Sequence, residues 1–226
     1  MSTTQSHPSS AALDPLVVRL EAMARLVATT LHNAIQALLE GNHQLASEVF
    51  LCEPQVNEME VSLDDWAVRI LAKPPANESD LRLVVAAMKI TNDLERMGDQ
   101  AVNIAERVIA RGGRKPFVGA EELPAMAAQV EEMVQSSLRA LLERDVGVAR
   151  RVLESDVVVD GHRDRIFQSL LATMAKEPSH LADTVHLLLA SRTLERIADH
   201  ATNISEDVIY WVRGLDVRHN MARARN

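Results

Sequence analysis

The sequence carries an internal repeat, and this repeat limits which folds the chain can adopt more than any other feature. Residues 91–106 contain LERMGDQAVNIAE, and residues 191–206 contain LERIADHATNISE at the matching place. The two windows agree at half of their positions. A second pair of segments also aligns, LLEGNHQLASEV from Leu38 and LLERDVGVARRV from Leu141. A period of about 100 residues is much longer than a solenoid repeat. We therefore interpret the chain as a duplicated structural unit.

Start and stop signals divide the chain into six helical segments. Apolar residues recur at helical spacing within each segment, and Gly, Pro, Asn, Asp or Ser residues stand between segments. The predicted helices cover residues 14 to about 40, 42 to about 72, 77 or 79 to 111, about 121 to 144, 145 to about 176, and 179 to 214. The residues expected to cap their first turns are Asp14, Asn42, Asn77 or Ser79, Asp145 and Ser179.

The composition agrees with an all-α protein. Hydrophobic residues make up 47% of the sequence and aromatic residues only 3%, so Leu, Val, Ala, Ile and Met must build the core. Such a core favours helices packed on helices. We predict a tandem duplication of an antiparallel three-helix bundle. The expected divisions are a disordered leader (1–13), a first bundle (14–111), a linker (112–120), a second bundle (121–214) and a basic tail (215–226).

Charge and motif content exclude several functional classes. The formal net charge of −8 argues against a general nucleic-acid-binding protein, which would present a basic face. No apolar run in the sequence is long enough to span a bilayer, and the N-terminus does not resemble a signal peptide. The lone Cys52 can form no internal disulfide, which agrees with a reducing compartment. The sequence has no Gly-rich phosphate loop, CxxC pair or Ser/His/Asp signature, so we do not expect an enzyme.

Each half carries a line of acidic and amide residues on its third helix. With about 100° of rotation per residue, Leu94, Met97 and Ala101 fall on the core face and the acids fall almost opposite. The members are Glu95, Asp99, Asn103 and Glu106 in the first half and Glu195, Asp199, Asn203 and Glu206 in the second. Carboxylates four residues apart destabilise a helix by about a few tenths of a kcal/mol. A penalty that recurs at matching places indicates a function, although a solvated surface also carries such residues.

Neighbouring helices supply further oxygen ligands. The second helix carries Glu53, Asn57, Glu60 and Asp64 on one face, and the fifth carries Asp156, Asp160 and Asp164. Two adjacent helices that present carboxylates along a shared edge suit a hard cation such as Mg²⁺, Ca²⁺, Mn²⁺ or iron. We predict a hard-cation site among the two acidic lines and these residues of the neighbouring helices. A basic partner protein is the other ligand that would fit these acids.

Five segments resemble the PhoU family of phosphate-signalling regulators. They are LERMGD from Leu94, LERIAD from Leu194, VNEME from Val56, SDLRLVVAAMKI from Ser79 and DVIYWVRG from Asp207. The resemblance implies two three-helix bundles in a cytoplasmic protein that is peripheral to the inner face of the membrane. It also implies a negative regulator of the phosphate-starvation response. Such a regulator would connect the ATPase subunit of the high-affinity phosphate transporter to a sensor histidine kinase and restrain phosphate uptake.

The same resemblance implies bound metal. Some PhoU proteins bind iron or zinc clusters on Glu/Asp-x-x-x-Asp motifs, and manganese and magnesium are further candidates. The ligands implied here are Glu95, Asp99, Glu195 and Asp199, with Glu53, Asp156 and Asp160 from neighbouring helices. The two halves differ at three places, where Ala198 matches Gly98, Asp160 matches Asn57 and Arg163 matches Glu60. We therefore expect two sites of different charge.

Two other functions remain open. A metal-storage protein or metal-dependent enzyme on a helical bundle would bury its ligands between helices, whereas these acids are expected to face outward. A dimeric scaffold would use the acids only as a polar surface. In that case Tyr210 and Trp211 are expected to be exposed apolar residues that serve a homodimer interface.

Overall fold

Helices make up the secondary structure in the computed structural model, which describes residues 13–72, 77–116 and 120–218. The elements are α1 (Asp14–Glu40), α2 (His43–Leu71), α3 (Glu78–Ala110), α4 (Leu123–Glu143), α5 (Val146–Lys176), the short 3-10 helix η1 (Pro178–His180) and α6 (Leu181–Arg213). The predicted all-α fold class is confirmed. Within the described ranges, no helix is long and apolar enough to cross a bilayer.

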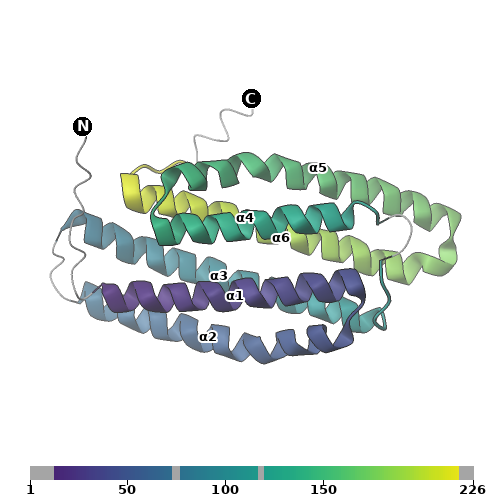
Figure 1. Ribbon diagram of the computed structural model, residues 1–226, viewed down its shortest axis with the longest axis horizontal. Coiled ribbons are helices and arrows are strands. Elements are labelled where there is room, and N and C mark those ends of the chain that lie inside the picture. Colours follow the sequence, from purple (N-terminus) through teal and green to yellow (C-terminus); the bar gives the residue numbers. More distant parts are fainter. Residues whose placement is uncertain (1–12, 73–76, 117–119, 219–226) are drawn as a thin grey trace.

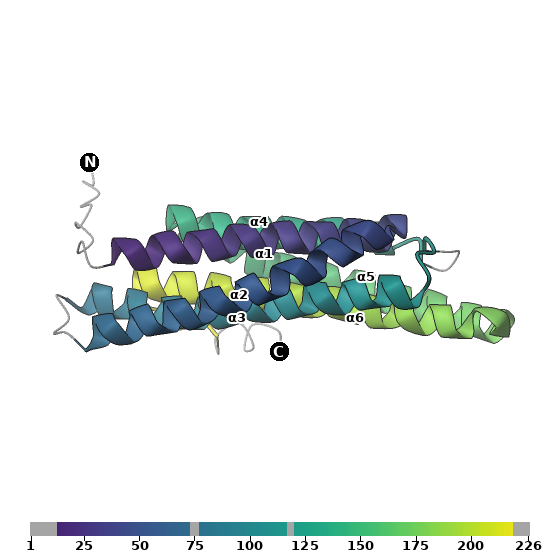
Figure 2. The ribbon, with the colours of Figure 1, turned by 90° about the horizontal axis from the view of Figure 1, so that it is seen from below.

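Each half packs three long helices against one another. Helices α1, α2 and α3 form the first group and α4, α5 and α6 the second, and α3 lies along α6 where the groups meet (Figure 1). Figure 2 shows α1 and α4 side by side in an elongated molecule. The division into two domains stays a prediction. The leader (1–12), part of the linker (117–119) and most of the tail (219–226) lie outside the described residues.

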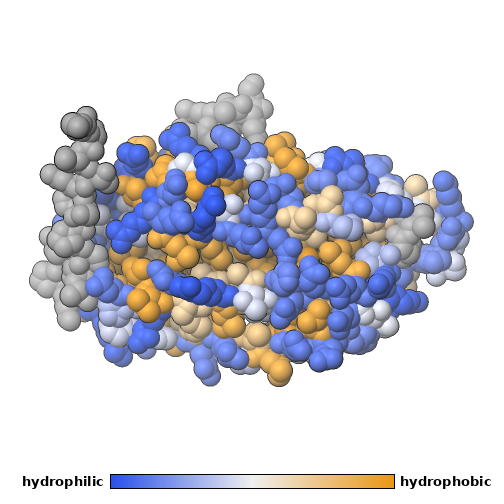
Figure 3. All heavy atoms as spheres, in the orientation of Figure 1, coloured by the Kyte–Doolittle hydropathy of each residue, from blue (hydrophilic) through white to orange (hydrophobic). Residues whose placement is uncertain are grey.

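The core is built from the helix faces that the spacing of apolar residues predicts. Leu94, Met97, Ala101, Ile104 and Val108 of α3 are all buried. Burial of one large aliphatic side chain contributes about 1.5–3 kcal/mol relative to exposure. On the surface shown in Figure 3, hydrophobic residues gather along the line between α1 and α4, within a mostly hydrophilic face. The apolar residues therefore hold each group of helices together and also lie where the two groups adjoin.

Matching caps fix the register of the repeat at the starts of α2 and α5. The Asn42 side chain accepts hydrogen bonds from the backbone N–H groups two and three residues later, and Asp145 does the same. Asn77 caps α3 by accepting from the backbone N–H of Asp80 at 2.9 Å. These three predicted caps are confirmed. The separation of Asn42 and Asp145 places Glu60 of α2 opposite Arg163 of α5 in the alignment.

Two predicted caps are wrong. Asp14 is already the first residue of α1, because the backbone N–H of Val17 donates to the carbonyl oxygen of Leu13 at 3.1 Å and closes an earlier turn. Ser179 lies inside η1 (Pro178–His180), and no side chain caps the start of α6. At α6, Pro178 sets φ near its helical value, so a turn forms before Ser179 can act as a cap. At α1, the backbone of Leu13 is already helical, so the helix begins one residue earlier than expected.

Ion pairs join the two halves along the α3–α6 seam. The side chain of Arg111 is fully buried, and its Nε donates to Oδ1 of Asp183 at 2.8 Å. This pair ties the end of α3 to the first turn of α6. Lys89 Nζ of α3 also donates to Oδ1 of Asp207 of α6 at 2.8 Å. Polar contacts therefore reinforce the packing of α3 on α6.

The expectation that Tyr210 and Trp211 are exposed is wrong. Trp211 is buried, and the guanidinium carbon of Arg144 lies 4.9 Å from the centre of its ring. Tyr210 is half-buried, with Lys89 Nζ 5.4 Å from its ring centre. Arg144 ends α4 and Lys89 lies in α3, so neighbouring helices cover both aromatic rings. The predicted homodimer stays a prediction and gains no support from these two residues.

Candidate functional site

The first half brings four carboxylates together on adjoining faces of α2 and α3. We call Glu60, Asp64, Glu95 and Asp99 the first acidic cluster. The charges interact across the two helices: the charge of Asp99 raises the pKa of Glu60, and the charge of Glu60 raises the pKa of Glu95. The Glu95 side chain is 16% exposed and that of Asp99 is 36% exposed. The acids thus lie outside the apolar core, as expected, but Glu60, Glu95 and Asp99 are half-buried, whereas Asp64 is exposed.

A close approach of α2 to α3 accompanies this partial burial. A Cβ added at Gly98 would lie 3.3 Å from Cγ1 of Val56, which is a tight contact. The glycine therefore lets the two helices approach one another beside Glu95 and Asp99. The matching residue of α6 is Ala198, whose methyl group is buried. The two halves consequently differ in packing at the acidic motif as well as in charge.

Burial and like-charge repulsion raise the pKa of both glutamates in the first cluster. Burial is the largest cause for Glu95, followed by the charges of Asp99 and Glu60. For Glu60, burial comes first and the charge of Asp64 next. Arg96 only partly offsets this, with Nε 3.5 Å from Glu95 Oε2 and Nη1 4.0 Å from Asp99 Oδ2. Within the described ranges, Glu95 Oε2 is buried and accepts no hydrogen bond. The cluster thus has excess negative charge and an unused acceptor.

The second half also brings acids together, from α5 and α6. We call Asp156, Asp160, Glu195 and Asp199 the second acidic cluster. Burial raises the pKa of Asp199, and the charges of the other three members raise it further. The predicted grouping of α5 and α6 acids around the second motif is therefore present in the structure. Their surroundings differ from those of the first cluster because an arginine lies among them.

Arg163 places a positive charge inside the second acidic cluster. Its Nη1 donates to Oε1 of Glu195 and lies 3.4 Å from Oδ1 of Asp160. Its Nε and Nη2 both donate to Oδ1 of Asp164, at 3.1 and 2.8 Å. Hydrogen bonds to Asp164 and Glu195 raise the pKa of Arg163, so the guanidinium stays charged. Glu60 occupies the matching place in α2, so one position changes the balance of charge between the clusters.

Three of the predicted ligands of the first half are not brought into the first cluster. The Asn103 side chain turns back along its own helix, and its Nδ2 donates to the backbone oxygen of Asp99 at 3.0 Å. Glu106 is exposed on α3. Glu53 lies two helical turns before Glu60, and the charges that shift the pKa values of the cluster's glutamates do not include it. The first cluster therefore consists of the two motif acids of α3 and the nearest acids of α2, and it omits the rest of the predicted line.

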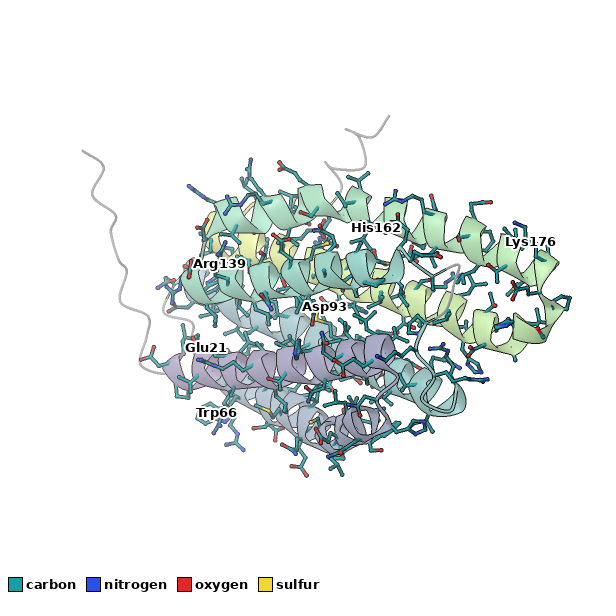
Figure 4. All side chains as sticks on the ribbon, turned by 45° about the vertical axis from the view of Figure 1, so that its right-hand side comes forward. Glu21, Trp66, Asp93, Arg139, His162 and Lys176 are labelled. Carbon is teal, nitrogen blue, oxygen red and sulfur yellow. The ribbon has the colours of Figure 1, made fainter. Side chains whose placement is uncertain are left out.

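Asn203 and Glu206 belong to a separate group at the α3–α6 seam. Asn203 Nδ2 donates to Oδ1 of Asp93 at 3.1 Å, and His200 Nδ1 lies 2.8 Å from the same oxygen. Burial raises the pKa of Glu206, with the charge of Asp207 as the next cause. Figure 4 labels Asp93, which lies between the two halves. Sequence reasoning missed Asp93 because only tertiary packing joins α3 to α6. The one sign of Asp93 in the sequence is that the matching residue of the second half, Thr193, is not an acid.

The donor atoms of the two clusters suit a metal to different degrees. The first cluster offers carboxylate oxygens, including the unused Glu95 Oε2, and such ligands suit hard cations. The second cluster already surrounds Arg163. In the ranges that the structure describes, no three His, Cys, Asp or Glu side chains are arranged as ligands of one metal ion. The first cluster thus fits a cation in chemistry but requires side-chain rotation to enclose one, and the second does not fit.

Comparison with known proteins gives a consistent result over both halves. A family model described as the PhoU domain matches residues 20–108 and residues 123–208. The chain is 38% identical to the phosphate-specific transport system accessory protein PhoU homolog of Pseudomonas aeruginosa, over 95% of this chain and 89% of that protein. It is 32% identical to the phosphate-specific transport system accessory protein PhoU of Serratia marcescens, over 93% of this chain and 86% of that protein.

Solved structures agree with the sequence comparisons. The crystal structure of PhoU from Pseudomonas aeruginosa is similar to this fold with a TM-score of 0.87 and 37% sequence identity, covering 91% of this chain and 99% of that one. The structure of the phosphate transport system regulatory protein PhoU from Streptococcus pneumoniae has a TM-score of 0.82 and 25% identity. It covers 91% of this chain and 97% of that one. Both similarities extend over nearly the whole described fold.

Proposed function

We propose, because the chain belongs to the PhoU family, that it is a negative regulator of the phosphate-starvation response and an accessory protein of a phosphate-specific transport system. The observation that supports this most strongly is the match of the PhoU domain to both halves of the chain. When phosphate is plentiful, the protein would restrain phosphate uptake and keep the starvation response off. It would act at the inner face of the membrane through its partners.

The finer part of the proposal concerns partners. We infer that the protein is an adaptor between the ATPase subunit of the transporter and a sensor histidine kinase. Two long groups of helices that lie side by side offer separate surfaces for two partners (Figure 1). The acidic clusters lie on those surfaces and can attract basic residues. Relatives are named as accessory or regulatory proteins, which supports action by binding rather than by catalysis.

We further propose that the first acidic cluster binds a cation in the working protein. Its carboxylates repel one another, and a bound cation would remove that repulsion. Glu60, Glu95 and Asp99 are the residues best placed to hold it, and the ion would supply positive charge that links α2 to α3. Iron, zinc, manganese and magnesium are the candidates. Elemental analysis of protein purified without an affinity tag tests this part, with Glu95→Ala plus Asp99→Ala as the variant expected to lose the metal.

Deletion in the host tests the regulatory role. Loss of the protein is expected to switch on a reporter of the phosphate-starvation response in medium with ample phosphate and to increase phosphate uptake. Complementation with the wild-type chain should restore both. A reporter that stays off after deletion would contradict the regulatory proposal. Complementation by the Glu95→Ala plus Asp99→Ala variant would separate that role from cation binding.

A further inference from the structure

The second acidic cluster contains a cation supplied by the chain itself. The guanidinium of Arg163 bonds to Glu195 through Nη1 and lies 3.4 Å from Asp160 through the same nitrogen. Its Nη2 donates to Asp164 at 2.8 Å. The Arg163 side chain is 33% exposed and that of Glu195 is 22% exposed, so both are partly shielded from water. A positive charge therefore already occupies the position between α5 and α6 where a metal ion would bind.

The geometry of the guanidinium makes this charge difficult to replace. Arginine presents several N–H donors in a fixed planar fork and remains charged at any ordinary pH. Arg163 uses that fork on acids of both α5 and α6 at once. A metal ion that entered the cluster would have to release these ion pairs and would then lie beside a displaced positive charge. Both requirements weaken the binding of a cation.

The first half provides an internal comparison. Helices α2 and α5 begin with equivalent caps, so Glu60 and Arg163 occupy the same register position. Glu60 adds a carboxylate to the first cluster, and its pKa is raised by burial and by the charges of Asp64 and Asp99. In the first half, Arg96 forms only the longer ion pairs, with Nε 3.5 Å from Glu95 Oε2 and Nη1 4.0 Å from Asp99 Oδ2. One substitution in the repeat thus separates a cluster whose acids lie 3.5 to 4.0 Å from an arginine from a cluster that an arginine holds by direct hydrogen bonds.

We propose that Arg163 is the resident counterion of the second acidic cluster, which clamps α5 to α6 and keeps metal ions out of that half of the protein. The chain would then contain a single cation-responsive half instead of two. The inference deepens the proposed cation binding, yet it does not depend on metal in the first cluster. Its substance is that an arginine closes the second cluster to metal ions, and that replacing this arginine with an uncharged residue opens the cluster.

The experiment uses the full chain with the first cluster disabled by Glu95→Gln and Asp99→Asn. In this background, Arg163→Gln removes the positive charge without adding a ligand, and Arg163→Lys is the matched control that retains the charge. Mn²⁺ is the probe, because the electron paramagnetic resonance signal of the free ion reports how much remains unbound. Circular dichroism verifies that each variant is folded. The Arg163→Gln variant should bind Mn²⁺ at least about tenfold more tightly than its parent, whereas Arg163→Lys should not.

A second readout follows the clamp itself. In EDTA, Arg163→Gln should lower the Tm, because Glu195 and Asp160 lose their counterion. Mn²⁺ should then raise the Tm of Arg163→Gln more than that of the parent. A further change of Glu195→Gln should remove the Mn²⁺ bound by Arg163→Gln, which would locate the ion in the second cluster.

The outcomes separate this inference from the proposed function. It is overturned if the parent with Arg163 intact binds Mn²⁺ in a way that depends on Glu195. It is equally overturned if folded Arg163→Gln gains no affinity. If the wild-type chain binds no metal but Arg163→Gln does, the inference is supported and the proposed cation binding of the first cluster fails.

Discussion

Glu95 and Glu195 hold matching positions in the repeat, but their carboxylates have different neighbours. Glu95 lies among like charges, with Arg96 at the edge of the group. Glu195 accepts a hydrogen bond from Arg163. The glutamate of the acidic motif is therefore held by a direct hydrogen bond to an arginine in one half and only by a longer ion pair in the other. At the scale of single residues, this difference makes the stability effects of one substitution opposite in the two halves.

Glu95→Gln is expected to stabilise the protein and Glu195→Gln to destabilise it when no divalent cation is present. The first change removes repulsion worth about 0.5 kcal/mol, which would raise Tm by about 1–2 °C in a chain of this size. The second breaks a partly buried charged hydrogen bond worth about 1 kcal/mol. Thermal unfolding in EDTA at neutral pH measures both. Shifts of Tm in the same direction would contradict the different surroundings described for the two glutamates.

The stabilising effect of Glu95→Gln should depend on pH. The folded state raises the pKa of Glu60 and Glu95 above the usual value of 4.5, so it binds protons before the unfolded state does. The free energy of unfolding from these groups therefore increases as pH falls through the folded pKa and levels off below the unfolded one. The advantage of Glu95→Gln over wild type should shrink between about pH 7.5 and about pH 4.5. Urea unfolding across this range provides the test, and a constant difference would argue against it.

At the scale of helices, most of the elements follow from local signals. Three caps could be identified because a cap-forming residue comes directly before a segment with apolar residues at helical spacing. These caps are Asn42, Asn77 and Asp145. Ser179 could not be assigned correctly because Pro178 before it begins a 3-10 turn, and Asp14 could not because the backbone of Leu13 is already helical. The acidic faces of α3 and α6 also follow from the helical period. Which acids of α2 and α5 lie against these faces depends on interhelical packing, which the sequence does not show. For this reason the sequence prediction names Glu53 as a metal ligand and omits Glu60.

The close contact of α2 and α3 predicts a size limit at Gly98. Gly98→Val should destabilise the protein by about 1–3 kcal/mol, because the added side chain would press against Val56. Combining it with Val56→Ala should cost less than the sum of the two single changes, since the smaller residue makes room. Ala198→Val provides a comparison at the matching place of α6. Chemical denaturation measures the coupling, and strictly additive effects of Gly98→Val and Val56→Ala would show that the two side chains do not compete for space.

At the scale of the whole molecule, the seam between α3 and α6 could not be predicted from the repeat. The repeat gives two similar groups of helices but does not say which helices face each other. Asp93, His200 and Asn203 form their contacts across this seam, and Arg111 bonds to Asp183 along it. All three of these hydrogen bonds join a residue of the first half to a residue of the second. The seam is therefore a property of the tertiary structure and explains why Asn203 and Glu206 leave the predicted acidic line.

The buried pair of Arg111 and Asp183 predicts strong coupling between the halves. Arg111→Met should destabilise the protein by about 3 kcal/mol, because the mostly buried carboxylate of Asp183 would lose its partner at 2.8 Å and retain Arg114, whose Nη2 lies 3.9 Å away. Asp183→Leu in the same chain should recover much of that loss by removing the uncompensated charge. Denaturation of both single variants and the double variant measures the coupling. Failure of the double variant to exceed Arg111→Met in stability would contradict the role assigned to this pair.

The adaptor role is the central claim about the whole molecule, and direct binding tests it best. The measurement is the association of the full chain with the purified ATPase subunit of the phosphate transporter and with the cytoplasmic part of the sensor histidine kinase from the same host, by surface plasmon resonance. The chain should bind each partner separately, and chain already bound to the ATPase subunit should still capture the kinase. Absence of binding to either partner under conditions where both are folded and active would contradict the adaptor role.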